Sequence, residues 1–251
     1  MMEPKWTDFN ALITILLEDT GTCFTVHKYV ACDRSSFVRA CLQDGFREKE
    51  EQTIIIKEWT TDQSMQYLVA WMYQGSEALK ASTVSTTVDP ERSVVFATQL
   101  QLAKLYILAD RFLMPKLKND VIDLFCSRPG RFSVTAMRVL WTEGPAECHL
   151  KNYILHRIVG DFRLRIMRNE EALDGEEQMK IPSKLVELIG DSSDFAQALI
   201  QMLIIGIPRD RTVCLYHEHG DHDVCAIKVK HEDIAAESYV VTSDMTATAS
   251  S

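Results

Sequence analysis

The sequence predicts an α+β protein, with a small β-sheet and several helices in its first half and a helical second half. Three observations support this fold class. Two β-prone segments lie close together near the N-terminus, a β-branched run follows at residues 54–56, and apolar residues recur at helical spacing over much of the remaining chain. With 251 residues, the chain can hold one large domain or two modest ones.

The first two strands are expected to form an antiparallel pair. Residues 12–17 are an apolar run, and residues 22–26 are β-prone. The Glu-Asp-Thr-Gly sequence between them has the composition of a hairpin turn. A third strand is expected at residues 54–56, because three consecutive isoleucines are too short for a helix and apolar on both faces. This pattern predicts a central strand.

Two short helices are expected after the hairpin. Ser35 or Ser36 could accept hydrogen bonds from the free amides of a helix that begins near Phe37. His27 lies between strand and helix, where a lone histidine is more often a hydrogen-bonded structural residue than a general base.

The clearest helical pattern follows the third strand. Apolar residues stand at positions i, i+3, i+4 and i+7, namely Met65, Leu68, Val69 and Met72. Thr60 and Gln63 have the spacing of a capping box, and Gly75 is expected to end the helix.

Two further helices are expected after residue 98. Apolar residues at positions 100–109 surround the helix axis almost completely, which predicts a helix buried on most sides. Pro115 suits the first turn of the next helix, whose apolar stripe consists of Leu117, Val121, Leu124 and Phe125. Residues 76–98 are polar and show no helical or strand period, so we expect a surface insertion there.

Three blocks of the first half, in this order, resemble a BTB/POZ domain. They are the strand-to-helix run at residues 24–37, the helix at residues 67–75 that ends in an aromatic residue, one further residue and glycine, and the helix at residues 105–112. The resemblance covers roughly half of the chain and implies a domain at residues 8–127. It also implies a small mixed sheet capped by helices, and a role in protein association rather than catalysis.

The second half is expected to be a helical extension at residues 131–206. Apolar faces occur around Leu140 and around Ile154, separated by the Gly144-Pro145 break. Residues 169–180 are acidic and contain Gly175, which predicts a loop. Two more helices follow, with apolar residues at positions 185–189 and 195–203.

A run of cysteines and histidines near the C-terminus has the composition of a structural zinc site. Residues 213–216 and 224–230 are β-prone, which predicts a hairpin within residues 210–231. Such a hairpin would gather five candidate ligands: Cys214, His217, His219, His222 and Cys225. Strict strand alternation, however, places positions three apart on opposite faces, so a bulge would be needed. The alternative is a polar hairpin with solvated histidines and no metal. Residues 237–251 are small and polar and are expected to be disordered.

Composition excludes several classes of function. The net charge of −9, from 36 acidic against 27 basic residues, argues against direct binding to nucleic acid. The sequence contains no signal-peptide pattern and no apolar run that could span a membrane. The seven cysteines lack a disulfide framework, and Cys32 and Cys126 are expected to be core residues. We therefore expect an intracellular protein, cytoplasmic or nuclear. It contains no catalytic motif that would indicate an enzyme.

The resemblance also implies candidate partners. Some BTB proteins act as substrate adaptors that bind the cullin scaffold of ubiquitin ligases through a hydrophobic-x-Glu motif before a strand, and Phe46 and Glu48 fit this motif. The alternative is a non-degradative scaffold, for example in transcriptional regulation, that binds itself, another BTB protein or another partner. Only residues 1–10 precede the first strand, too few for a long exchanged arm, so the oligomeric state stays open.

Overall fold

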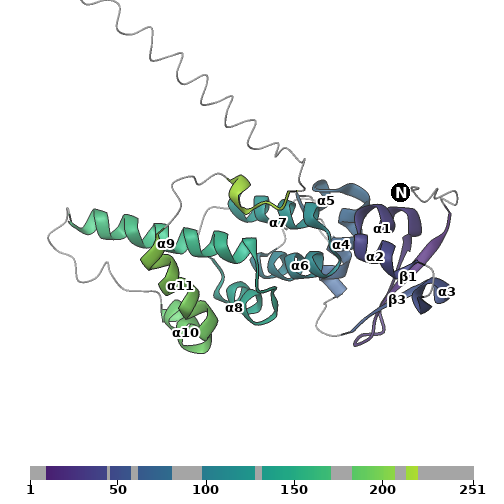
Figure 1. Cartoon of the computed structure of the whole chain (residues 1–251), viewed down its shortest axis with the longest axis horizontal. Helices are drawn as coiled ribbons and strands as arrows, with labels where there is room; N and C mark the ends of the chain where they lie inside the picture. The colour runs from purple at the N-terminus through teal and green to yellow at the C-terminus, as the bar shows by residue number, and fades with distance from the viewer. Residues whose placement is uncertain are drawn as a thin grey trace, which may run out of the picture.

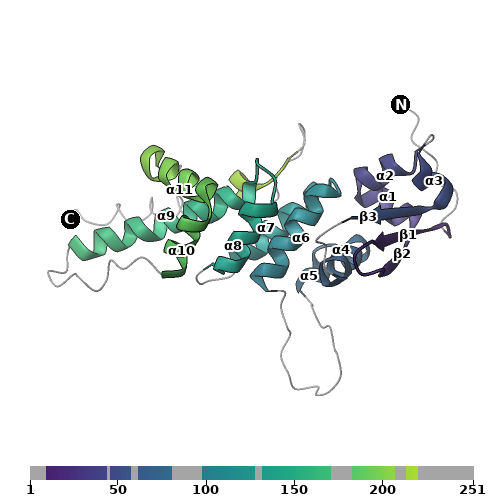
Figure 2. The ribbon, with the colours of Figure 1, turned by 90° about the horizontal axis from the view of Figure 1, so that it is seen from below.

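The computed structural model describes residues 10–43, 46–57, 62–80, 98–127, 132–170, 183–206 and 213–219. These residues form an elongated molecule with the β-sheet at one end and the helical extension at the other (Figures 1 and 2). Helix α6 lies between the two ends. In the described part of the chain, no single helix is long and apolar enough to cross a bilayer, and α10 with α11 meets that test only as a pair bent by 115°.

The sheet has three strands in the order β2-β1-β3. Strand β1 (Leu12–Leu17) pairs antiparallel with β2 (Cys23–His27) and parallel with β3 (Thr53–Ile56). Ile15 of the central strand lies between Phe24 and Ile54 in this register. Alternate residues of β1 are buried, so one face of the strand packs on the core. The predicted antiparallel pair is confirmed.

The prediction of a central third strand is wrong, because β3 lies at the edge of the described sheet. Its Ile54 is 2% exposed, whereas its Ile55 is 40% exposed. A strand that buries only one face can still consist of β-branched residues, since these side chains suit the extended backbone on either face. The run of isoleucines therefore predicts a strand but not its position in the sheet.

Three short helices lie between β2 and β3 in the chain. Helix α1 (Lys28–Arg34) begins directly after β2, and α2 (Ser36–Cys41) follows it. Ser35 is the N-cap of α2, where its hydroxyl accepts a hydrogen bond from the Val38 amide. Helix α3 (Arg47–Glu51) then leads into β3 through Gln52 in the left-handed conformation, with φ of 48°.

Helix α4 (Asp62–Gln74) contains the predicted apolar stripe and ends at Gly75, whose φ of +63° favours glycine. The proposed capping residue Thr60 lies outside the described residues. The expected insertion does not begin at residue 76, because α5 (Glu77–Lys80) buries Ala78 and Leu79. The sequence did not predict this single helical turn, because its segment is polar and a helix this short depends on tertiary packing. Residues 81–97 are outside the described part.

Helix α6 (Gln99–Arg111) is the centre of the molecule. Thr98 and Gln101 form a capping box at its start, and every residue from Leu105 to Ala109 is buried. It contacts α4, α7 (Pro115–Ser127) and α8 (Val134–Glu143). Both the burial of α6 and the start of α7 at Pro115 agree with the sequence prediction.

The helical extension consists of α8, α9 (His149–Glu170), α10 (Ser183–Asp191) and α11 (Ser193–Ile205). Helix α9 continues to Glu170, into the start of the loop expected at residues 169–180. Trp141 of α8 packs edge-on against Phe195 of α11, with ring centroids 4.8 Å apart. One continuous cluster of buried apolar residues joins the sheet, α6 and the extension.

The predicted strand at residues 213–216 is wrong, because Val213–Tyr216 forms the 3₁₀ turn η1. Its contacts with α7 and α9 outweigh the β-propensity of its residues. The other strand of the expected hairpin and the tail at residues 237–251 lie outside the described residues.

Candidate interaction surfaces

Phe46 and Glu48 lie at the start of α3, beside the edge strand. Phe46 is the N-cap residue of this five-residue helix, and its side chain is 54% exposed rather than packed into the core. Glu48 belongs to the first turn and is half-buried. Helix α3 contacts β3, whose Ile55 is also exposed. Phe46 and Ile55 are thus two exposed apolar side chains in the adjoining elements α3 and β3.

Glu48 of α3 lies near Cys41 of α2. Burial raises the pKa of Cys41 in α2, and the negative charge of Glu48 adds to this effect. The Cys41 thiol accordingly stays protonated near neutral pH. Arg47 also pairs with Glu51 at 2.5 Å along the exposed side of α3. Glu48 therefore lies close enough to Cys41 for its negative charge to act on the thiol.

His27 and Tyr73 connect the end of β2 to the end of α4. The Tyr73 hydroxyl accepts a hydrogen bond of 2.9 Å from the His27 amide and lies 2.8 Å from the Nδ1 atom of His27. His27 is therefore a hydrogen-bonded structural residue, as its position in the sequence predicts.

Two of the cysteines also have a structural environment. Cys32 is buried, and burial raises the pKa of Cys126 to about 11, so both cysteines contribute to packing rather than to thiolate chemistry.

The candidate zinc ligands are only partly described. Cys214 lies in η1, His217 and His219 follow it, and His222 and Cys225 are outside the described residues. The rings of His217 and His219 are 5.8 Å apart. Within the described ranges, no group of three or more His, Cys, Asp or Glu side chains could hold a metal ion. Nε2 of His217 lies 2.9 Å from Oδ1 of Asp123, a contact that zinc-binding histidines also commonly make through their second nitrogen.

Residues 213–219, which we call the C-terminal strap, lie on α7 and α9. Tyr216 and His217 are buried there, although Leu215 is exposed. The hydroxyl of Tyr216 is 2.6 Å from Nδ1 of His156 in α9, and Asn119 in α7 forms two hydrogen bonds with the backbone of Glu218. The sequence did not predict this contact, because it joins residues 99 positions apart that share no recognisable motif.

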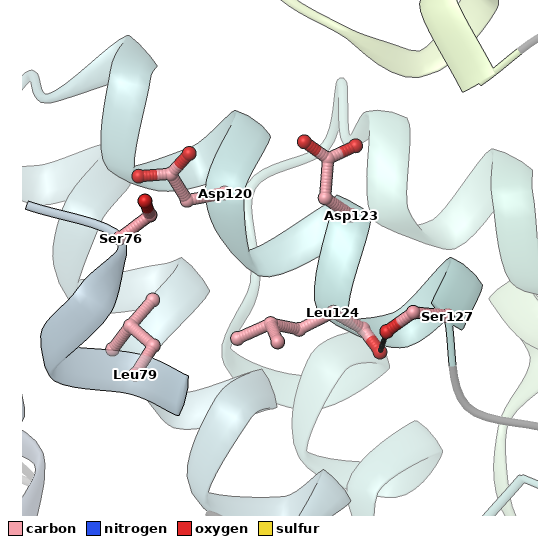
Figure 3. A pocket seen from close by; sticks show the side chains of 6 residues that line it. All are labelled: Ser76, Leu79, Asp120, Asp123, Leu124 and Ser127. Atoms are coloured by element: carbon pink, nitrogen blue, oxygen red, sulfur yellow. Dashed lines mark hydrogen bonds between the residues drawn. The ribbon is translucent and has the colours of Figure 1, made fainter. Parts of the chain in front are cut away.

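A shallow pocket of about 230 Å³ lies between α5 and α7 (Figure 3). Six residues line it: Ser76, Leu79, Asp120, Asp123, Leu124 and Ser127. Its two carboxylates are already hydrogen-bonded within the fold, Asp120 to the Trp71 indole at 2.7 Å and Asp123 to His217. Each aspartate therefore connects α7 to another part of the fold.

Helix α11 carries a second exposed apolar surface. Phe195 and Leu199 face the core, as the sequence predicts, but Leu203 does not. Ile204 and Ile205 at the end of the helix are 77% and 83% exposed. Isolated exposed apolar residues are common, whereas a group at the end of one helix indicates a contact surface. The signal in the sequence is the Leu-Ile-Ile run, which is too apolar for a single buried stripe.

A three-stranded mixed sheet capped by helices, with exposed apolar side chains on its edge strand, places the first half of the chain in the α+β class. Residues 5–128 match the BTB/POZ domain family. The chain is therefore a BTB/POZ domain-containing protein, and BTB domains act as protein–protein interaction modules. No curated protein matches the chain.

Proposed function

We propose that this protein is a substrate adaptor that binds a cullin-type scaffold through α3. The observation that supports this proposal is the exposure of Phe46 at the N-cap of α3, two positions before Glu48 and beside the sheet edge. An exposed aromatic side chain is costly to leave in water and is typical of residues that dominate the binding energy of an interface.

In this proposal, Phe46 inserts into an apolar notch of the scaffold, and burial of its ring supplies most of the affinity. Glu48 then meets a basic or polar group of the partner and fixes the orientation. Ile55 of the edge strand widens the apolar part of the contact. In the same proposal, the helical extension recruits or positions the protein that is to be modified.

The second candidate is a scaffold without a role in degradation, which associates with itself, another BTB protein or another partner. The exposed apolar end of α11 favours this reading, because it offers a second contact surface far from α3 (Figures 1 and 2). In both cases we propose an intracellular protein without catalytic activity of its own.

A pulldown with purified cullin scaffold separates the two candidates. We expect the wild-type protein to bind, and Phe46→Ala and Glu48→Lys each to weaken binding by about tenfold or more, because each change removes a central contact. Tyr29→Ala is the matched control, since it truncates another exposed aromatic side chain outside α3. Absence of wild-type binding, or equal binding by all four proteins, would exclude the adaptor function and leave the scaffold.

A further inference from the structure

The C-terminal strap is held in the way that a protein holds a bound peptide. The side-chain amide of Asn119 donates a hydrogen bond of 2.8 Å to the Glu218 carbonyl and accepts one of 2.8 Å from the Glu218 amide. A neighbouring strand would satisfy the same two backbone groups. Asn119 therefore recognises the backbone of the strap rather than one particular side chain.

Tyr216 is the aromatic anchor of the strap. Its side chain is buried, its ring packs edge-on against Tyr153 at a centroid distance of 5.2 Å, and its hydroxyl reaches Nδ1 of His156. Both contacts come from α9, in the helical extension. An aromatic ring with a satisfied hydroxyl is a typical anchor of peptide recognition.

Glu218 supplies the charged contact. Its carboxylate pairs with Lys118 of α7, whose side chain is only 7% exposed and which also binds Asp110 at 2.6 Å. Burial by itself would lower the pKa of Lys118, but the hydrogen bonds with Asp110 and Glu218 raise it above its ordinary value. A buried ammonium group of this kind selects a carboxylate from whatever segment lies beside it.

Several of the described contacts between the strap and the helices are polar. Leu215 and His219 are exposed, His217 bonds to Asp123, and Glu218 bonds to Asn119 and Lys118. Segments with little buried apolar surface open locally at a lower free energy than the global unfolding of the protein. Opening of the strap alone is accordingly expected to cost less free energy than global unfolding.

We propose that the surface formed by Asn119, Lys118, Tyr153 and His156 is a peptide-recognition site for segments with tyrosine followed two residues later by glutamate, and that residues 216–218 occupy it as a displaceable intramolecular latch. The latch ties α9 of the extension to α7 of the BTB domain. A protein segment with the same signature gains access only by displacing it. This site is separate from α3, so the proposal does not depend on cullin binding.

The test uses the full chain and a fluorescent peptide with the sequence of residues 213–219. In the double variant Tyr216→Ala/Glu218→Ala the latch keeps its backbone bonds to Asn119 but loses its aromatic anchor and its charged contact. We therefore expect the site to bind the peptide at least about tenfold more tightly than in the wild type, whose intact latch competes. Adding Asn119→Ala should weaken binding by about tenfold, since two hydrogen bonds are lost. Lys116→Ala, an exposed change on the same helix, is the matched control. A peptide with alanine in place of tyrosine should not bind.

Failure of the folded double variant to bind the peptide, or equal binding after Asn119→Ala, would overturn the proposal. Circular dichroism shows whether the double variant is folded. Hydrogen exchange on the wild-type protein is an independent test of whether the latch opens locally. We expect the Glu218 amide to be protected, but to exchange at least about tenfold faster than the amides of α6, and to lose this protection in Asn119→Ala. If the Glu218 amide exchanged at the rate of a free peptide, or only together with the amides of α6, a displaceable latch would be ruled out.

Discussion

Ser35 shows how one small side chain connects two distant parts of the chain. Its hydroxyl accepts a hydrogen bond from the Val38 amide at the start of α2 and donates one of 2.6 Å to the Phe112 carbonyl, where α6 ends. The residue is fully buried. Both backbone groups would be left without this partner if the hydroxyl were removed.

Ser35→Ala is therefore expected to lower the free energy of unfolding by about 1 to 3 kcal/mol, because a helix cap and a buried hydrogen bond are lost together. Ser36→Ala is the control, since Ser36 is exposed and its bond to the Leu113 carbonyl is 3.3 Å long. It should change the stability by less than about 0.5 kcal/mol. Urea unfolding of the three proteins measures both values, and equal stability of the two variants would contradict this role of Ser35.

The zinc hypothesis is also tested at the scale of single residues. If Cys214, Cys225 and two of the histidines bind zinc, protein purified without chelator should contain close to one zinc ion per chain by elemental analysis. Replacing both cysteines by serine should remove it. Cys23→Ser, at an exposed cysteine far along the sequence, is the control and should leave the zinc content unchanged. Metal-free wild-type protein would disprove the hypothesis.

At the scale of elements, β3 differs from the expectation of a strand buried on both faces. Ile54→Ala should lower the free energy of unfolding by about 2 to 5 kcal/mol, because Ile54 lies in the core. The adjacent Ile55→Ala should cost less than about 1 kcal/mol, since its side chain faces outward. Thermal or urea unfolding distinguishes the two. Similar large losses at both positions would mean that β3 is covered on its outer face as well.

Elements with a local cause could be predicted from the sequence. The stripes of α4 and α7, the all-round burial of α6 and the hairpin turn all follow from residue spacing within one segment. The position of β3 in the sheet, the turn α5 and the 3₁₀ turn η1 depend on contacts with distant residues, which spacing does not reveal.

The same distinction applies to the candidate surfaces. The motif at Phe46 and Glu48 could be read from three consecutive residues, but the exposure of Phe46 required the fold. The site that Asn119 forms with Glu218 could not be predicted, because neither residue type nor spacing indicates a pair across 99 positions. The burial of the Lys118 side chain likewise could not be predicted, because a charged residue is expected at the surface.

At the scale of the whole molecule, the BTB domain and the extension share one apolar core. Helix α8 packs directly on α6, and Leu140 of α8 is fully buried. Two parts that share a core are expected to unfold in one cooperative transition.

Tryptophan fluorescence and circular dichroism should therefore report the same midpoint during urea unfolding of the full chain. Leu140→Ala should move both signals together and lower the free energy of unfolding by about 2 to 5 kcal/mol. Val186→Ala, at an exposed position of α10, should leave the midpoint nearly unchanged. Two separate transitions, of which Leu140→Ala affects only one, would show that the halves are independent.

The contact of α8 with α6 also has a consequence during synthesis of the chain on the ribosome. When residues up to Ser127 have left the exit tunnel, α6 is complete but α8 has not yet emerged. At ordinary rates of translation, the residues through Glu143 follow roughly one to three seconds later. During this interval the nascent protein exposes the apolar side of α6, and a chaperone that binds such surfaces would find its target there.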